Sequence, residues 1–142
     1  RRLEHFLRPD PGKLSDPAYL KVNTLLTLYT GVFAAKPLVE LDPVAAQLAA
    51  ATPKGSVQFV VDSNEPMAHI VYGDTGVEPQ KGGTARPSAI MRFADWSAAN
   101  RIITGGLDAF SATGKGLLCL EGNVPIIDNT GLIMDRVTRY LA

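Results

Sequence analysis

The chain has 142 residues, 46% of them hydrophobic and 20% charged, which is the size and composition of one folded domain. Its 14 basic and 14 acidic residues cancel, so no excess positive charge favours nucleic acid as a binding partner. The single cysteine, Cys119, excludes an intrachain disulfide and a multi-cysteine metal site, and it favours a reducing, cytoplasmic location.

The first third of the chain predicts a helix after an irregular lead-in. Residues 1–15 mix charges with prolines and a glycine, which interrupt regular structure. Asp16-Pro17 marks a helix start, since aspartate accepts hydrogen bonds from free N–H groups and proline in the first turn loses none. Apolar residues then recur at three- and four-residue spacing, which predicts a helix to about Ala35. After this lead-in we expect a single domain over residues 16–142, in keeping with the length of the chain.

The middle of the chain predicts a second helix and then strands. Asp42-Pro43 repeats the helix-start signal, and the alanine-rich run Val44–Ala51 predicts a short helix. From Val57 the apolar residues recur at every second position, which is the period of a strand. The predicted strands are Val57–Val61, Met67–Tyr72, Ser88–Phe93 and Leu117–Glu121, with a fifth left open within residues 75–87.

Two further helices and a long last helix complete the predicted elements. Asp95 predicts the N-cap of a helix over Trp96–Thr104, and a shorter helix follows over Leu107–Thr113. The last helix begins at about Gly122-Asn123. Its predicted buried stripe is Ile126, Ile133, Met134, Val137 and Leu141.

The order of these elements from Ser88 onward is that of a known family. A strand, Asp95-Trp96, a helix, Thr104-Gly105 and a short helix precede the string Gly116-x-Leu118-x-Leu120-x-Gly122-Asn123 and an amphipathic helix. This pattern resembles the sterol carrier protein family, the sterol-binding or lipid-transfer domain. The resemblance implies an α+β fold, with about five mainly antiparallel strands in one sheet, helices packed on one face, and an apolar cavity between the two layers.

No residue pattern in the chain predicts catalysis. The only histidines are His5 and His69, no serine lies in a Gly-x-Ser-x-Gly turn, and we interpret His69 as a hydrogen-bonded strand residue. Thr113–Gly116 lacks the residues of a phosphate-binding loop, and Cys119 lies between leucines, as a structural cysteine does. Two histidines and one cysteine do not supply a zinc ligand set, so we expect no metal and no cofactor.

The apolar side chains are the remaining candidates for a functional role. Together with the resemblance, they predict non-catalytic binding or transfer of an apolar lipid-like ligand, of the fatty-acyl, sterol-like or isoprenoid class, in a cavity that opens near the C-terminal helix. Methionines and aromatic rings suit such a cavity, because they adapt to irregular shapes and offer large contact areas. The predicted ligand-binding residues are Phe59, Met91, Phe93, Trp96, Ile103, Phe110, Leu118, Leu120, Ile133, Met134 and Val137.

The strand Leu117–Glu121 leaves two interpretations open, because both of its faces are apolar. Relatives usually carry polar residues where this chain has Leu117 and Cys119. Either the strand is buried on both faces, or its outer face meets a second copy, a partner protein or an N-terminal segment that precedes this sequence. The alternative function is therefore an accessory or dimerisation domain that presents substrate to a catalytic partner. Transient membrane contact is compatible with both functions. A third hypothesis is an enzyme that acts alone through His69.

Overall fold

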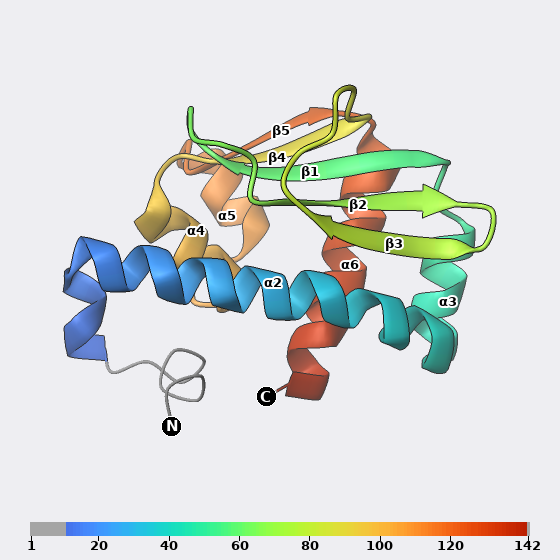
Figure 1. The fold of residues 1–142 in the computed structure, drawn as a ribbon, viewed down its shortest axis with the longest axis horizontal. Helices are drawn as coiled ribbons and strands as arrows, with labels where there is room; N and C mark the ends of the chain where they lie inside the picture. Colours follow the sequence, from blue (N-terminus) through green and yellow to red (C-terminus); the bar gives the residue numbers. More distant parts are fainter. Residues whose placement is uncertain (1–10, 142) are drawn as a thin grey trace.

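The computed structural model describes residues 11–141, which form a five-stranded sheet with helices on one side of it (Figure 1). The strands are β1 (Gly55–Val61), β2 (Ala68–Gly73), β3 (Gly76–Lys81), β4 (Ala89–Phe93) and β5 (Leu118–Gly122). They lie in the order β3-β2-β1-β4-β5. The sheet is mixed, because β1 and β4 run parallel whereas the other three neighbouring pairs are antiparallel. The fifth strand, which the sequence left open within residues 75–87, is β3.

The helical layer lies below the sheet in the view of Figure 1. Its elements are a 3-10 helix η1 (Pro11–Ser15) and the helices α2 (Pro17–Leu41), α3 (Pro43–Ala50), α4 (Trp96–Ile103), α5 (Ala109–Gly114) and α6 (Val124–Leu141). From Ser88 onward, the predicted elements occur with shifts of one or two residues at their ends. The predicted lead-in lies outside the described residues up to position 10. Within 11–141, no helix is long and apolar enough to cross a membrane.

Helix α2 starts where the sequence predicts and ends later. The Asp16 side chain accepts a hydrogen bond from the Ala18 backbone N–H at 3.0 Å, as expected for its N-cap. The predicted end at Ala35 is wrong, because the helix continues through Pro37 to Leu41. A proline inside a helix removes one backbone hydrogen bond. Packing onto the sheet edge offsets this cost, and an ion pair at 2.8 Å joins Lys36 of α2 to Glu78 of β3.

Alternate positions of each strand point toward the helices and form the core. On β1 these are Val57, Phe59 and Val61, which are at most 2% exposed. The register places Phe59 opposite Met91 of β4, and Met91 opposite Leu120 of β5. We call the space between this side of the sheet and the helices the interior. Its floor includes α6, since the Tyr72 hydroxyl of β2 lies 2.7 Å from the Thr130 hydroxyl of that helix.

The loop between β3 and β4 covers part of the outer face of the sheet. His69 Nδ1 donates to the Gly82 carbonyl at 2.9 Å, and the Gln58 side chain accepts from the Thr84 backbone N–H at 2.9 Å. Both side chains are therefore buried, although they point away from the helices. His69 is a hydrogen-bonded strand residue, as the sequence predicts.

Candidate functional site

The structure brings most of the predicted ligand-binding residues together around the interior. The buried members are Phe59, Phe93, Leu118, Ile133 and Val137. The partly buried members, which pack against this core, are Met91, Trp96, Ile103 and Met134. Strands β1, β4 and β5 and helices α4 and α6 supply them. Whether these residues bind a ligand remains a prediction.

Phe110 does not lie in the interior. Its side chain is 90% exposed, so the expectation that it faces the core is wrong. Helix α5 buries Ala112 instead, and two positions along a helix correspond to about 200° around its axis. The burial of Ala112 against the core therefore turns Phe110 toward solvent.

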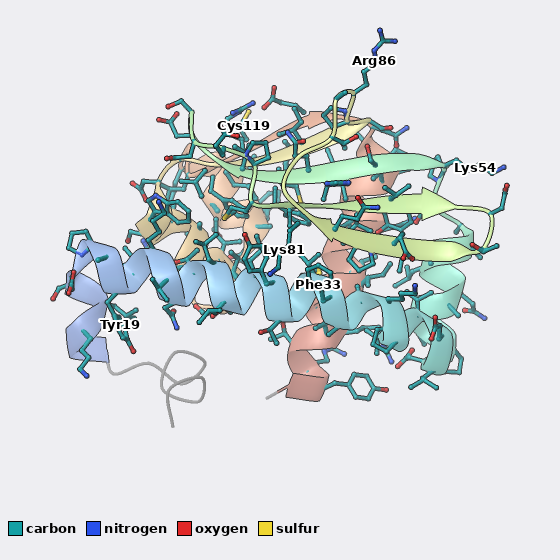
Figure 2. The ribbon with its side chains drawn as sticks, viewed as in Figure 1. Tyr19, Phe33, Lys54, Lys81, Arg86 and Cys119 are labelled. Atoms are coloured by element: carbon teal, nitrogen blue, oxygen red, sulfur yellow. The ribbon has the colours of Figure 1, made fainter. Side chains whose placement is uncertain are left out.

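The exposed side chains of β5 separate the two interpretations of that strand. Cys119 is exposed and lies on the side of the sheet away from the helices (Figure 2). On the same outer face, Arg92 of β4 pairs with Glu121 at 3.0 Å. Burial of β5 on both faces is therefore wrong. Among residues 11–141, β5 is an edge of the sheet and pairs with β4 alone, and contact of its outer face with a partner chain remains a prediction.

Within residues 11–141, the helical layer covers one end of β5 more completely than the other. Leu118 and Leu120 point to the same side, toward the helices. Leu118 is only 2% exposed, whereas Leu120 is 39% exposed. Met91, which is opposite Leu120 in the register, is partly buried. An apolar side chain of the interior thus reaches solvent at this edge, and we call this place the β5 opening.

A second apolar recess lies between α2 and α6, and the sequence did not reveal it. This α2–α6 groove has a volume of about 300 Å³. Its lining residues are Ala34, Pro37, Leu38, Leu41, Asp42, Val137 and Tyr140. Of these, only Val137 belongs to the predicted ligand-binding set. The groove depends on how two helices distant in the sequence cross, and no local pattern encodes that crossing.

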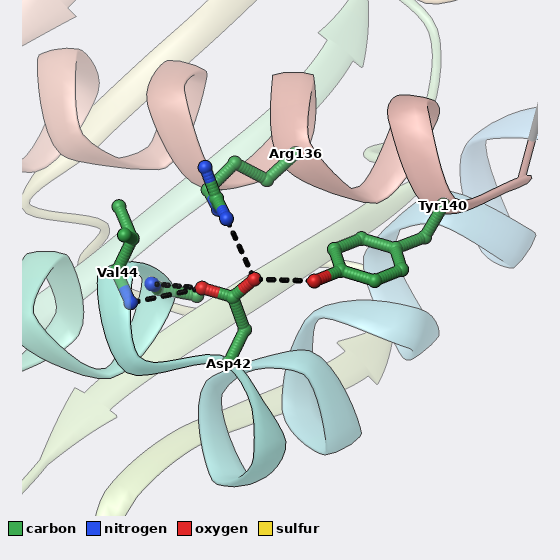
Figure 3. A network of polar contacts seen from close by, with 5 residues as sticks. Asp42, Val44, Arg136 and Tyr140 are labelled. Carbon is green, nitrogen blue, oxygen red and sulfur yellow. Dashed lines mark hydrogen bonds and ion pairs between the residues drawn. The ribbon is translucent and has the colours of Figure 1, made fainter.

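A polar network closes one end of the α2–α6 groove (Figure 3). One oxygen of Asp42 accepts hydrogen bonds from the first backbone N–H groups of α3, those of Val44 and Ala45. The other oxygen accepts from the Arg136 guanidinium and from the Tyr140 hydroxyl, each at 2.7 Å. The carboxylate therefore joins the α2–α3 junction to the last turns of α6.

The electrostatics of this network favour the charged carboxylate. Hydrogen bonds from Arg136, Tyr140 and the Ala45 N–H, in that order, hold the pKa of Asp42 far below its usual value. The same carboxylate raises the pKa of Arg136 and of Tyr140. Asp42 thus stays ionised and paired at any ordinary pH, and the buried end of the groove carries no uncompensated charge.

A larger hollow of about 550 Å³ lies beside the β2–β3 hairpin, and its chemistry differs. Lys36, Glu40 and Glu78 contribute to its walls, and the Lys36–Glu78 ion pair belongs to it. Such a charged surface does not favour an apolar ligand. In the part of the chain that is described, no three histidine, cysteine or acidic side chains are grouped to hold a metal ion.

The chain was compared with known families, curated proteins and solved structures. No family model and no curated protein matches it. A sterol carrier protein domain of Helicoverpa armigera superposes with a TM-score of 0.59 at 14% identity, covering 80% of this chain and 89% of that one. The UbiJ-SCP2 ubiquinone synthesis protein gives 0.58 at 11% identity, covering 78% and 96%. A sterol carrier protein 2 crystal structure gives 0.52 at 19% identity, covering 78% and 94%.

This chain has the sterol carrier protein fold. The resemblance seen from Ser88 onward is therefore confirmed at the level of architecture, over more than three quarters of the chain. Identities of 11–19% do not carry over a ligand or a residue's role. In the sterol carrier protein fold of this chain, the interior and its β5 opening have to be judged by their own side chains.

Proposed function

We propose that this chain binds an apolar lipid-like ligand, of the fatty-acyl, sterol-like or isoprenoid class, in the interior between its sheet and its helices. Binding is non-catalytic, and the ligand is held for transfer or for presentation. The proposed contacts come from the predicted set without Phe110, whose side chain is 90% exposed. The fold shared with sterol carrier proteins supports this proposal.

The observation that carries the proposal is the exposure of Leu120. Leu120 is on the helix-facing side of β5, opposite Met91, and 39% of it is exposed to water. Beside it, Met91 is an adaptable side chain that changes shape at little cost. An apolar ligand that enters here covers Leu120 and displaces Met91 inward or aside.

Burial of hydrocarbon supplies the affinity without a polar anchor. Each methylene that leaves water contributes about 0.8 kcal/mol, so a medium-length chain offsets the cost of association through apolar contact alone. The partly buried Trp96, Ile103 and Met134 extend the apolar lining from the opening toward α4 and α6.

Two substitutions on adjacent residues of β5 test this proposal. Leu120→Gln places an amide at the opening, whereas Cys119→Gln places the same amide on the outer face of the strand. Titration with a fluorescent fatty acid should show roughly fivefold weaker binding for Leu120→Gln and no change for Cys119→Gln. Equal affinities of both variants and the wild type contradict binding at this opening.

Native mass spectrometry of the purified chain adds an independent measurement. A co-purifying lipid supports the proposal, and its mass identifies the class. Met91→Arg and Met134→Arg should each abolish its retention, because an unpaired charge in the interior is costly to bury. Thermal unfolding has to remain cooperative in both variants, since core damage also releases a ligand.

The edge position of β5 favours the accessory-domain function as a second candidate. An edge strand presents unpaired backbone groups to another chain, and Cys119 and Leu120 add apolar surface on its two sides. A lipid-free dimer in sedimentation analysis supports this function. A monomer that carries lipid contradicts it.

A further inference from the structure

We infer that the α2–α6 groove holds a single acyl chain, at a place separate from the interior. This inference rests on the proposed binding of apolar ligands and adds a second binding site for one ligand class. It follows from the apolar walls of the groove and from the Asp42 carboxylate at its end, which is fully hydrogen-bonded.

The walls of the groove are two apolar stripes. On α2 the lining residues are Ala34, Pro37, Leu38 and Leu41, whose spacing of three and four residues places them on one face. On α6 they are Val137 and Tyr140, one turn apart. At a rise of 1.5 Å per residue, the α2 stripe makes a trough roughly 11 Å long.

The groove and the interior share one wall. A side-chain carbon added at Gly31 of α2 would lie 3.0 Å from the Met134 methyl group of α6, so the end of the Met134 side chain already fills the space beside Gly31. The groove begins one turn further along α2, at Ala34. Val137 forms the common wall, because it is 3% exposed and also belongs to the core.

The size and shape of the groove select an acyl chain over a fused-ring molecule. Its volume of about 300 Å³ is at the lower limit of ligand pockets, which extend to roughly 1,000 Å³. A recess of this volume accommodates part of one flexible chain, whereas a fused ring system with its side chain needs a larger one.

The polar end of the groove tolerates such an occupant. Asp42 is only 5% exposed, and each of its two carboxylate oxygens already accepts two hydrogen bonds. An acyl chain beside it therefore strips water from no unpaired charge. The exposed rim consists of Leu41, at 83%, and the ring of Tyr140, at 66%, which are apolar surfaces that an acyl chain covers.

Paramagnetic relaxation locates the ligand directly. In NMR spectra of the full chain with spin-labelled stearic acid, the backbone amides of Leu41 and Tyr140, which line the groove but not the interior, should broaden most strongly. Broadening in this region, with or without broadening near Met91 and Leu120, supports the groove. Broadening confined to the Met91–Leu120 region overturns the groove and leaves the proposed function standing. A spectrum without any broadening overturns the groove and contradicts fatty-acyl binding as well.

A groove-filling variant gives a second, independent test. Ala34→Phe occupies the trough and should weaken stearic acid binding at the groove amides about tenfold. Leu132→Phe is the matched control, because Leu132 is half exposed on α6 and does not line the groove. An amide spectrum that keeps its dispersion verifies folding of both variants. Undiminished broadening of the groove amides in folded Ala34→Phe contradicts the inference.

Discussion

The interior and the α2–α6 groove are both lined by apolar side chains, but they differ in how they are closed. The middle of the interior is closed to solvent, with Phe93, Leu118 and Ile133 at most 2% exposed. The groove is open to solvent along its rim, where Leu41 is 83% exposed and Tyr140 is 66% exposed. Residue type alone does not distinguish a filled core from an open recess, and the crossing of the elements decides between them.

The largest effect on stability is expected when a large side chain is removed from the closed middle of the interior. Phe93→Ala should lower the free energy of unfolding by about 3–5 kcal/mol, because a fully buried ring leaves a cavity. Phe110→Ala is the control of equal chemistry, and its 90% exposed ring should contribute less than about 0.5 kcal/mol. Urea unfolding measures both values. Similar losses in the two variants would mean that Phe110 packs in solution.

A smaller effect is expected at the boundary between the two regions. Gly31 is buried beside the Met134 methyl group, so Gly31→Leu inserts a side chain where no room is left and should cost about 1–3 kcal/mol through overpacking. Gly131→Leu on α6 meets open space, and it should stabilise the helix slightly because leucine has the higher helix propensity. Thermal unfolding compares the two substitutions. A Gly31→Leu variant as stable as the wild type contradicts the close packing of Met134 against Gly31.

The closed end of the groove predicts a pH dependence. Asp42 has a lowered pKa in the folded state, against 3.8 in the unfolded chain, so its stabilisation is present above about pH 4. It is lost as the pH falls toward the folded pKa, because the unfolded state then binds more protons. Asp42→Asn keeps an N-cap acceptor for α3 but loses the charge that pairs with Arg136.

The wild type should therefore exceed Asp42→Asn in stability at neutral pH, and the difference should shrink as the pH is lowered from about 4 to about 2. Urea unfolding at a series of pH values gives this difference directly. A difference that stays constant over that range contradicts the assigned cause of the pKa shift.

The smallest effect on stability is expected at the groove rim. Leu41 is 83% exposed, so Leu41→Ser should change the free energy of unfolding by less than about 0.5 kcal/mol. The same substitution removes apolar surface that an acyl chain in the groove covers, so it should reduce fatty-acid broadening of the Tyr140 amide. A large loss of stability would show that Leu41 is not a rim residue.

The sequence predicted helices and strands correctly where a capping residue and the spacing of apolar residues indicate the same element. Asp16 and Asp42 start their helices as aspartate-proline pairs do, and both side chains cap as expected. Strand β3 was harder to predict, because Pro79 argues against a strand in the sequence. Proline is tolerated in this strand because β3 lies at the edge of the sheet. The end of α2 was missed, since packing against β3 overrides the local effect of Pro37.

The candidate site was less accessible to sequence reasoning than the fold. Parity along the strands placed Phe59, Met91 and Leu120 on one side correctly, but it could not give the exposure of Leu120. The partners of Asp42 lie 94 and 98 residues further along the chain, at Arg136 and Tyr140. Contacts over such separations follow from the crossing of α2 with α6 and have no local signature.

The parallel pairing of β1 with β4 divides the assembly of the sheet into two stages. β1, β2 and β3 are consecutive antiparallel strands, so they can zip together as soon as their short turns form. β4 joins β1 only after the chain has passed the whole hairpin, and closing that longer loop costs more entropy before any contact repays it. The rate of folding should accordingly be set by the docking of the β4–β5 half onto β1.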